Sequence, residues 1–169
     1  MWKRIPMLLL LVAPYAALYA FGNVEIHWLL LCAGYVMILV GNAVYAFFLP
    51  KLGFQSDQIL FWDMFLKLGH AILYISIFAA SGWLAFLMGP YVLLITVAEY
   101  MLLLSTSMFG VSGLWKACRG GELTIRAVIV HAVLHFFFCL DVISAVICYI
   151  KIRRVRKQNR TLPEASAAE

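Results

Sequence analysis

The chain has 169 residues, of which 65% are hydrophobic and only 12% are charged, and its mean hydropathy is +0.96. A water-soluble fold of this size has too little interior to bury so much apolar surface, which excludes a soluble globular domain. The net charge of +5 does not indicate nucleic-acid binding, because six of the thirteen basic residues lie just after the last apolar segment, where lipid headgroups attract them. The composition predicts an all-α, polytopic transmembrane helical bundle in the cell membrane.

A helix that rises about 1.5 Å per residue needs roughly 20 apolar residues to cross about 30 Å of hydrocarbon. Five segments meet or approach this length, and together they make one bundle over residues 1–157 with no soluble domain. The predicted spans are residues 6–21, 26–49, 59–88, 91–115 and 123–150. The tail, residues 158–169, is polar and rich in small residues, and it is predicted to be disordered.

The first segment resembles a signal peptide, because Lys3 and Arg4 precede a short apolar run. A cleavage site near Ala20 would require a small residue at the position that Leu18 occupies. We therefore expect an uncleaved first helix, which is the shortest of the five predicted spans.

The basic residues do not choose an orientation for a five-span chain, whose two termini lie on opposite sides. One side would receive six of them, namely Lys3, Arg4, Lys51, Lys116, Arg119 and Arg126, and the carboxyl-terminal segment carries another six. In that segment the residues predicted to meet lipid headgroups are Lys151, Arg153, Arg154, Arg156 and Lys157. Their density favours a cytoplasmic tail. Dual insertion, or a segment that does not span, remains an alternative.

Ionisable side chains within the spans require partners or water, because a charge at the bilayer centre costs on the order of 2.5 to 3.5 kcal/mol on insertion scales. Seven such residues make up a predicted polar core: Asp63, Lys67, His70, Glu99, His131, His135 and Asp141. Helical spacing puts Asp63, Lys67 and His70 on one face and allows the first two to pair. His131 and His135 share another face, whereas Asp141 would lie about 120° around the same helix from His135.

If the five spans alternate in direction, the distance of each residue from the start of its helix gives its depth in the membrane. Lys67, His70, His131 and His135 would form one layer, roughly 12 to 18 Å from the starts of their helices. Glu99 and Asp141 would lie deeper, where two carboxyl groups could share one proton. Glu99 also shares a face with small residues, which predicts that this face packs against protein.

Several interpretations fit the histidines. His131 and His135 have the spacing of two ligands on a helix, with His70 as a further candidate, but the glutamate of the HExxH motif and an evident third ligand are missing. Haem ligation by His70 with His131 or His135 is another alternative. The histidines and charges could instead satisfy one another to specify packing, or line a cavity that binds or moves a proton or small solute. No cofactor is predicted.

Three stretches carry a resemblance to a known family: residues 62–70 (WDMFLKLGH), 99–110 (EYMLLLSTSMFG) and 135–145 (HFFFCLDVISA). They resemble a family of small, uncharacterised integral membrane proteins of Gram-positive bacteria that is classed as a domain of unknown function. The chain has Ala71 where the family pattern would have proline. The resemblance implies no activity, but it places Lys67, His70, Glu99, His135 and Asp141 within recognisable motifs.

The sequence thus predicts an integral membrane protein with a polar intramembrane core that binds or conducts a proton or small solute. The alternative is an accessory or structural subunit that docks onto a partner membrane protein or onto a second copy of itself. A metal- or haem-binding membrane protein is the third interpretation. No nucleophile elbow, phosphate-binding loop or HExxH motif is present, so we expect a protein that is not an enzyme. The expected partner in every case is the lipid bilayer.

Overall fold

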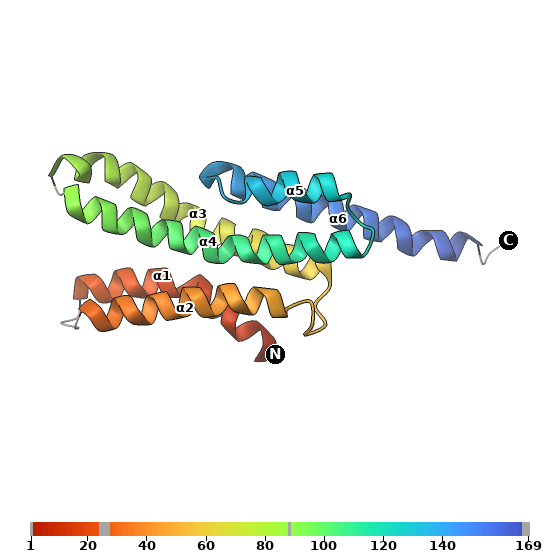
Figure 1. Ribbon diagram of the computed structural model, residues 1–169, viewed down its shortest axis with the longest axis horizontal. Helices are drawn as coiled ribbons and strands as arrows, with labels where there is room; N and C mark the ends of the chain where they lie inside the picture. The colour runs from red at the N-terminus through yellow and green to blue at the C-terminus, as the bar shows by residue number, and fades with distance from the viewer. Residues whose placement is uncertain (1, 24–27, 88, 167–169) are drawn as a thin grey trace.

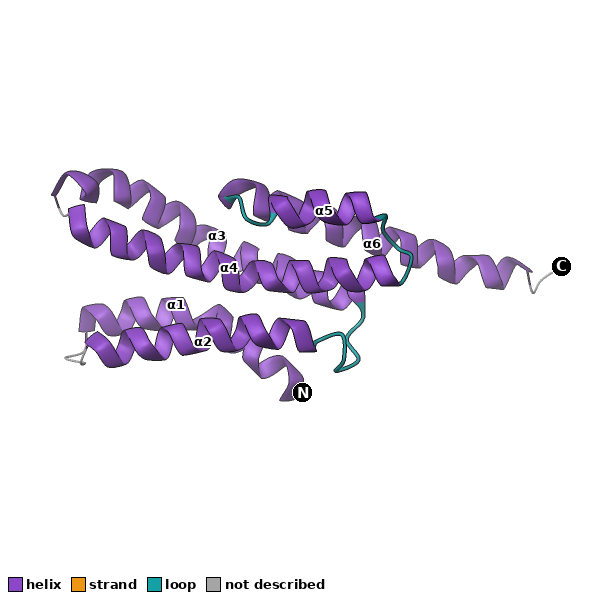
Figure 2. Cartoon of the chain, in the orientation of Figure 1, coloured by secondary structure: helices purple, strands orange, loops and turns teal. Residues whose placement is uncertain are grey.

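The computed structural model describes residues 2–23, 28–87 and 89–166, and within these ranges the chain consists of helices and loops (Figure 2). In chain order the helices are the short 3₁₀ turn η1 (Trp2–Arg4), α1 (Ile5–Asn23), α2 (Trp28–Phe48), α3 (Ser56–Leu87), α4 (Gly89–Arg119), α5 (Ile125–Leu134) and α6 (Phe138–Ser166). The all-α class predicted from composition is confirmed.

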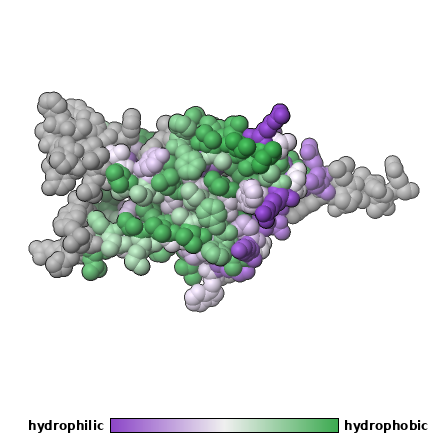
Figure 3. All heavy atoms as spheres, in the orientation of Figure 1, coloured by the Kyte–Doolittle hydropathy of each residue, from purple (hydrophilic) through white to green (hydrophobic). Residues whose placement is uncertain are grey.

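Four helical segments are long and apolar enough to cross a membrane. They are Trp2–Ala20, Leu30–Phe48, Ser56–Ser76 and Thr96–Arg119. They coincide with the first four predicted spans, whose boundaries at residues 26 and 88 lie outside the described residues. Large apolar side chains are exposed along these helices, as lipid contact requires, and Figure 3 shows hydrophobic residues over the middle of the visible face.

The antiparallel helices α3 and α4 form the centre of the bundle, with α1 and α2 on one side and α5 and α6 on the other (Figure 1). Two serines on α4 form hydrogen bonds to the backbone of α2. Ser105 Oγ donates to the Leu39 carbonyl at 2.8 Å, and Ser112 Oγ donates to the Ala46 carbonyl at 2.7 Å. Both pairs are seven residues apart on each helix, so the small hydroxyl side chains hold the two backbones close along one shared face.

The structure differs from the predicted fifth span, because residues 123–150 form two helices rather than one. The chain reverses at residues 135–137, so that α6 runs back beside α5 (Figure 1). His131 Nδ1 therefore lies 2.9 Å from Ser144 Oγ, whereas a continuous helix would hold these residues about 20 Å apart. The prediction of one span over 123–150 is corrected to a helical hairpin.

Ion pairing explains why the chain turns at a place without glycine or proline. On a continuous helix His135 and Asp141 would point in directions about 120° apart, and they could not both reach one side chain on α3. With the turn between them, both contact Lys67. An unpaired cation in an apolar interior is highly unfavourable. We infer that pairing Lys67 offsets the helical hydrogen bonds lost at the three turn residues.

The hairpin brings the basic residues to one end of the molecule. This basic end contains η1, the loop 49–55, the end of α4, the start of α5 and the second half of α6 (Figure 1). Lys3 Nζ donates to the Leu52 carbonyl at 2.9 Å, and Lys116 Nζ donates to the Phe54 carbonyl. Among the described residues, Lys67 is the one lysine or arginine outside these segments apart from Lys151, which lies at the middle of α6. The apparent six-to-six division of charge was a consequence of assuming five spans.

A network of polar contacts closes the basic end. Arg156 on α6 forms ion pairs with Asp57, in the first turn of α3, and with Glu122, in the α4–α5 connection, the latter at 2.5 Å. Ser56 Oγ donates to the second carboxylate oxygen of Glu122. Gly121, with φ of +70°, provides the sharp exit from α4 that brings Glu122 into reach. The open ends of the hairpin are therefore tied to the start of α3.

The tail also differs from its prediction. Residues 158–166 continue α6 as helix instead of forming a disordered segment, and the remaining predicted residues lie outside the described part of the chain. The lysine and arginine residues of 151–157 have high helix propensity and account for that part of α6, but they do not explain the continuation through Asn159, Thr161 and Pro163.

Cysteine labelling tests this topology. In a background without the native cysteines, single cysteines at Lys51, Arg119 and Arg154 are expected to react with a membrane-impermeant maleimide from the same side of sealed vesicles. The hairpin returns α6 to the end that holds the other two positions, which is the physical reason. Labelling of Arg154→Cys from the opposite side would restore the five-span arrangement. Full labelling after detergent permeabilisation is the control for reactivity.

Candidate functional site

Lys67 is a completely buried lysine near the middle of the bundle. It lies about 16 Å along α3 from the first residue of that helix, which is close to half the thickness of a bilayer core. The helix α5, at ten residues, extends about 15 Å before the chain turns. The tip of the hairpin consequently lies at the depth of Lys67.

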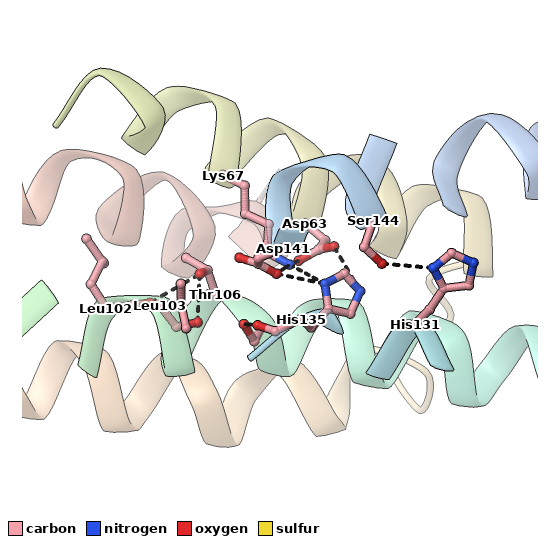
Figure 4. A network of polar contacts seen from close by, with 10 residues as sticks. Asp63, Lys67, Leu102, Leu103, Thr106, His131, His135, Asp141 and Ser144 are labelled. Atoms are coloured by element: carbon pink, nitrogen blue, oxygen red, sulfur yellow. Dashed lines mark hydrogen bonds and ion pairs between the residues drawn. The ribbon is translucent and has the colours of Figure 1, made fainter. Parts of the chain in front are cut away.

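Three ionisable side chains surround the ammonium group of Lys67 (Figure 4). Asp63, one turn earlier on α3, has Oδ1 2.7 Å from Lys67 Nζ, and Asp141 on α6 forms a second ion pair with the same atom. Lys67 Nζ also lies 2.7 Å from Nδ1 of His135, at the end of α5. All four side chains are buried, and we refer to Asp63, Lys67, His135 and Asp141 as the charge cluster.

The Nδ1 atom of His135 lies between a cation and an anion. It is 2.7 Å from Lys67 Nζ and 2.8 Å from Asp141 Oδ1. A neutral imidazole can accept a hydrogen bond from the lysine at this nitrogen, whereas a protonated Nδ1 can donate to the aspartate, and one nitrogen cannot do both at once. Two proton arrangements therefore fit one set of atomic positions.

The formal charge of the cluster depends on His135. With a neutral imidazole, two carboxylates face one ammonium group and the cluster carries one net negative charge. A proton on His135 makes the cluster neutral, and the opposite ring nitrogen, Nε2, then faces Asp63 Oδ2 at 3.8 Å. A net charge in a low-dielectric interior is unfavourable, so the neutral and the negative form of the cluster differ in energy.

The backbone at the hairpin tip is satisfied from the bundle. Helix α5 ends at Leu134, and its C-cap residue is His135. Ser107 Oγ on α4 donates to the His135 carbonyl at 2.6 Å. Asp141 lies in the first turn of α6, where the helix dipole favours a negative charge. At the break His135 is buried and its carbonyl is satisfied by α4, whereas Phe136 and Phe137 of the turn present exposed apolar side chains.

Gly110 provides the space in which His135 and Asp63 meet. A Cβ atom at this position would lie 2.6 Å from His135 Nε2 and 2.9 Å from Asp63 Oδ2. Both distances are far inside van der Waals contact, so any larger residue on this face of α4 must displace the cluster. Gly110 is a packing requirement of the site.

Two of the predicted core residues lie apart from the cluster. His131 is half-buried and bonds Ser144, one turn of α5 before His135. His70 is buried beside the rings of Tyr15 and Tyr74 and faces the backbone of Leu10 and Leu11 on α1. Pro14 on α1 has no N–H to donate, which leaves the Leu10 carbonyl without its helical partner. His70 thus packs against the irregular part of α1.

Glu99 is also separate from the charge cluster. It is buried on α4, about 12 Å along the helix from Ser107. Among the described residues, no ion pair or hydrogen bond joins it to Asp141, whose carboxylate contacts Lys67 and His135. The expectation that these two carboxyl groups share a proton is replaced by the pairing of Asp141 with Lys67.

The three histidines considered as metal or haem ligands do not converge. His135 faces Lys67 and Asp141, His131 faces Ser144, and His70 faces α1. Within the described ranges no group of three histidine, cysteine or carboxylate side chains has a metal-binding arrangement. An ammonium group occupies the position at which His135 and the two aspartates meet, and it would repel a metal ion there.

Sequence reasoning missed the contributions of Ser107 and Ser144. Each is a serine within an apolar run, which is a weak signal because serines also mediate ordinary helix packing in membranes. Their partners, the His135 carbonyl and the His131 ring, are brought to them only by the chain reversal.

Fold and site together define a polytopic helical membrane protein with a buried charge cluster at the tip of a helical hairpin. The family of unknown function DUF6652 matches residues 64–154, more than half of the chain, and the protein belongs to this family. The matched segment contains Lys67, His135 and Asp141 and begins immediately after Asp63. No curated protein and no solved structure matches the chain.

Proposed function

We propose that this protein is a non-enzymatic integral membrane protein whose charge cluster binds and releases a proton within the bilayer. The observation that supports this proposal most directly is the position of His135 Nδ1, which lies at nearly equal distances from the ammonium group of Lys67 and the carboxylate of Asp141. A proton can be added or removed there with little movement of heavy atoms. Ionisable groups at membrane depth are costly, and a functional role is the usual reason for their presence.

The hairpin supports a role in transport. Interrupted helices that meet at the bilayer midplane are a recurring way to build binding sites in channels and transporters, because helix ends supply polar groups there. Here α5 ends and α6 begins at the depth of Lys67. The conducted species that fits this chemistry best is a proton. A small solute that exchanges with a proton is the broader class.

The orientation follows from the basic end. Lysine and arginine accumulate on the cytoplasmic side of membrane proteins, so we place η1, the loop 49–55 and the second half of α6 in the cytoplasm. The resemblance to membrane proteins of Gram-positive bacteria supports a location in the bacterial cell membrane.

Proton flux into sealed vesicles tests the proposal. Vesicles that contain the purified protein are expected to dissipate an imposed pH gradient faster than protein-free vesicles. His135→Gln is expected to reduce the protein-dependent rate at least about tenfold, as the loss of a proton-transferring side chain commonly does. A pH-sensitive dye inside the vesicles gives the rate.

His131→Gln is the matched control, because His131 lies one turn away on the same helix but bonds Ser144 outside the cluster. This variant is expected to keep most of the flux. Equal losses in both variants, or a wild-type rate no greater than that of empty vesicles, would contradict the proposal. Elution as a single species in detergent establishes that each variant is folded.

A second candidate function is that of an accessory subunit docked onto another membrane helix. The observation that favours it is the face of α2 that carries Gly34 and Gly41, where added Cβ atoms would meet nothing within 4 Å. These glycines are seven residues apart and share one exposed face, the kind of surface that lets helices approach closely. The flux measurement separates the two candidates, since an accessory subunit alone would not conduct protons.

A further inference from the structure

A cavity of about 320 Å³ opens at the basic end between η1, α3 and α6. Arg4 comes from η1 and Arg153 from α6, while Phe61 and Trp62 on α3 line the apolar part. A neighbouring cavity of about 240 Å³ shares Arg4 and adds Lys3. Neither cavity is lined by a residue of the charge cluster.

The two arginines that line the first cavity, Arg4 and Arg153, are not paired with a carboxylate in the part of the chain that the structure describes. Asp57 also lines it, but its carboxylate already pairs with Arg156. Arg153 donates only to the uncharged Tyr149 hydroxyl, at 3.2 Å, and neither Arg4 nor Arg153 forms an ion pair among the described residues. The cavity therefore presents two guanidinium groups without an ion pair in the described ranges, beside the group of Asp57, Arg156 and Glu122, whose two carboxylates share one guanidinium.

The position of η1 is held by backbone contacts. Tyr45 donates to the Lys3 carbonyl at 2.6 Å, and Lys3 Nζ donates to the Leu52 carbonyl at 2.9 Å. These bonds keep Arg4, the next residue, at the mouth of the cavity. Contacts between α2, the loop 49–55 and η1 therefore fix the backbone that carries Arg4.

An aromatic surface continues from the cavity along α3. Phe61 stacks on Phe65 with ring centroids 5.9 Å apart, and each side chain is 40% exposed. Tyr149 packs against Phe61 from α6 at 5.7 Å. Phe61 and Phe65 lie about 7.5 and 13.5 Å from the start of α3, between the basic end and the depth of Lys67, where an acyl chain would lie beside them.

We propose that this cavity binds the phosphate-bearing headgroup of an anionic phospholipid, with an acyl chain lying against Phe61 and Phe65. Arginine recognises phosphate through paired hydrogen bonds, and basic pockets between helices at the cytoplasmic face are typical sites for anionic headgroups. The adjoining apolar surface favours a lipid over a free phosphate. This inference goes beyond the proton site and shares with it only the location in a bilayer.

Lipid retention measured by native mass spectrometry tests the inference. The full chain in detergent is titrated with phosphatidylglycerol and, separately, with phosphatidylcholine. The wild type is expected to retain phosphatidylglycerol preferentially, and Arg4→Gln/Arg153→Gln is expected to weaken that binding about 30-fold. The matched control, Arg126→Gln/Arg154→Gln, removes the same charge from two exposed arginines that do not line the cavity, and it should bind like the wild type.

Equal retention of the two lipids, or equal weakening by both double variants, would overturn the proposal by reducing it to general surface charge. Glycerol 3-phosphate is the competitor that separates a lipid from a free phosphate. Displacement of phosphatidylglycerol by a comparable concentration of glycerol 3-phosphate would overturn the assignment to a lipid. His135→Gln should retain phosphatidylglycerol normally, so failure of the proton site and failure of the lipid site give different results.

Discussion

Replacing Lys67 with methionine is expected to lower the free energy of unfolding by about 3 to 5 kcal/mol, because it leaves two buried carboxyl groups without their shared cation. Asp63 and Asp141 both face the ammonium group at the centre of the bundle, with no solvent to replace it. Unfolding in mixed detergent micelles, followed by circular dichroism, measures the effect. Lys51→Met is the control, since Lys51 is exposed in a loop and its change should stay within about 0.5 kcal/mol.

A compensated variant separates stability from function. Lys67→Met combined with Asp63→Asn and Asp141→Asn removes all three charges together, and it is expected to recover most of the lost stability. The same variant should conduct no protons, because the ammonium group and the carboxylate that contact His135 Nδ1 are absent. A single Lys67→Met variant as stable as the wild type would show that the three charges are not coupled in the folded protein.

Gly110→Ala is expected to destabilise the protein by about 1 to 3 kcal/mol, although alanine ordinarily favours a helix over glycine. The added Cβ would overlap the His135 ring and the Asp63 carboxylate, which lie 2.6 and 2.9 Å from its position. Relief requires the hairpin tip to move away from α4. The unfolding assay used for Lys67 gives the stability, and the vesicle assay is expected to show reduced proton flux.

Gly41→Ala is the matched control for this substitution. Gly41 is also a glycine within an apolar helix, but nothing lies within 4 Å of its added Cβ. In a monomeric, detergent-solubilised sample the change should stabilise the protein by up to about 1 kcal/mol. If the two alanine variants shift stability in the same direction and by the same amount, Gly110 does not limit the approach of His135.

The charge cluster, the hairpin and the basic end depend on one another. Arg156, Glu122 and Ser56 hold the open ends of the hairpin, while Lys67 holds its tip through His135 and Asp141. Because both attachments fix α5 and α6 against α3, His135 stays in register with Asp63. The lipid site proposed beside α6 is built on the same helix, and its arginine Arg153 lies one turn before Arg156.

The sequence by itself determined the all-α class and the first four helices, which are long and apolar enough to cross a membrane, because length and hydropathy are local properties of each segment. It also determined the Asp63–Lys67 pair, since i, i+4 spacing on one helix needs no tertiary information. Only the tertiary structure decided the partners of Lys67 on α5 and α6. The run 123–150 contains no glycine or proline at the turn, so nothing local marks the reversal between His135 and Asp141. Attraction between charges far apart in the sequence, within an interior that offers them no water, decides where the chain turns back.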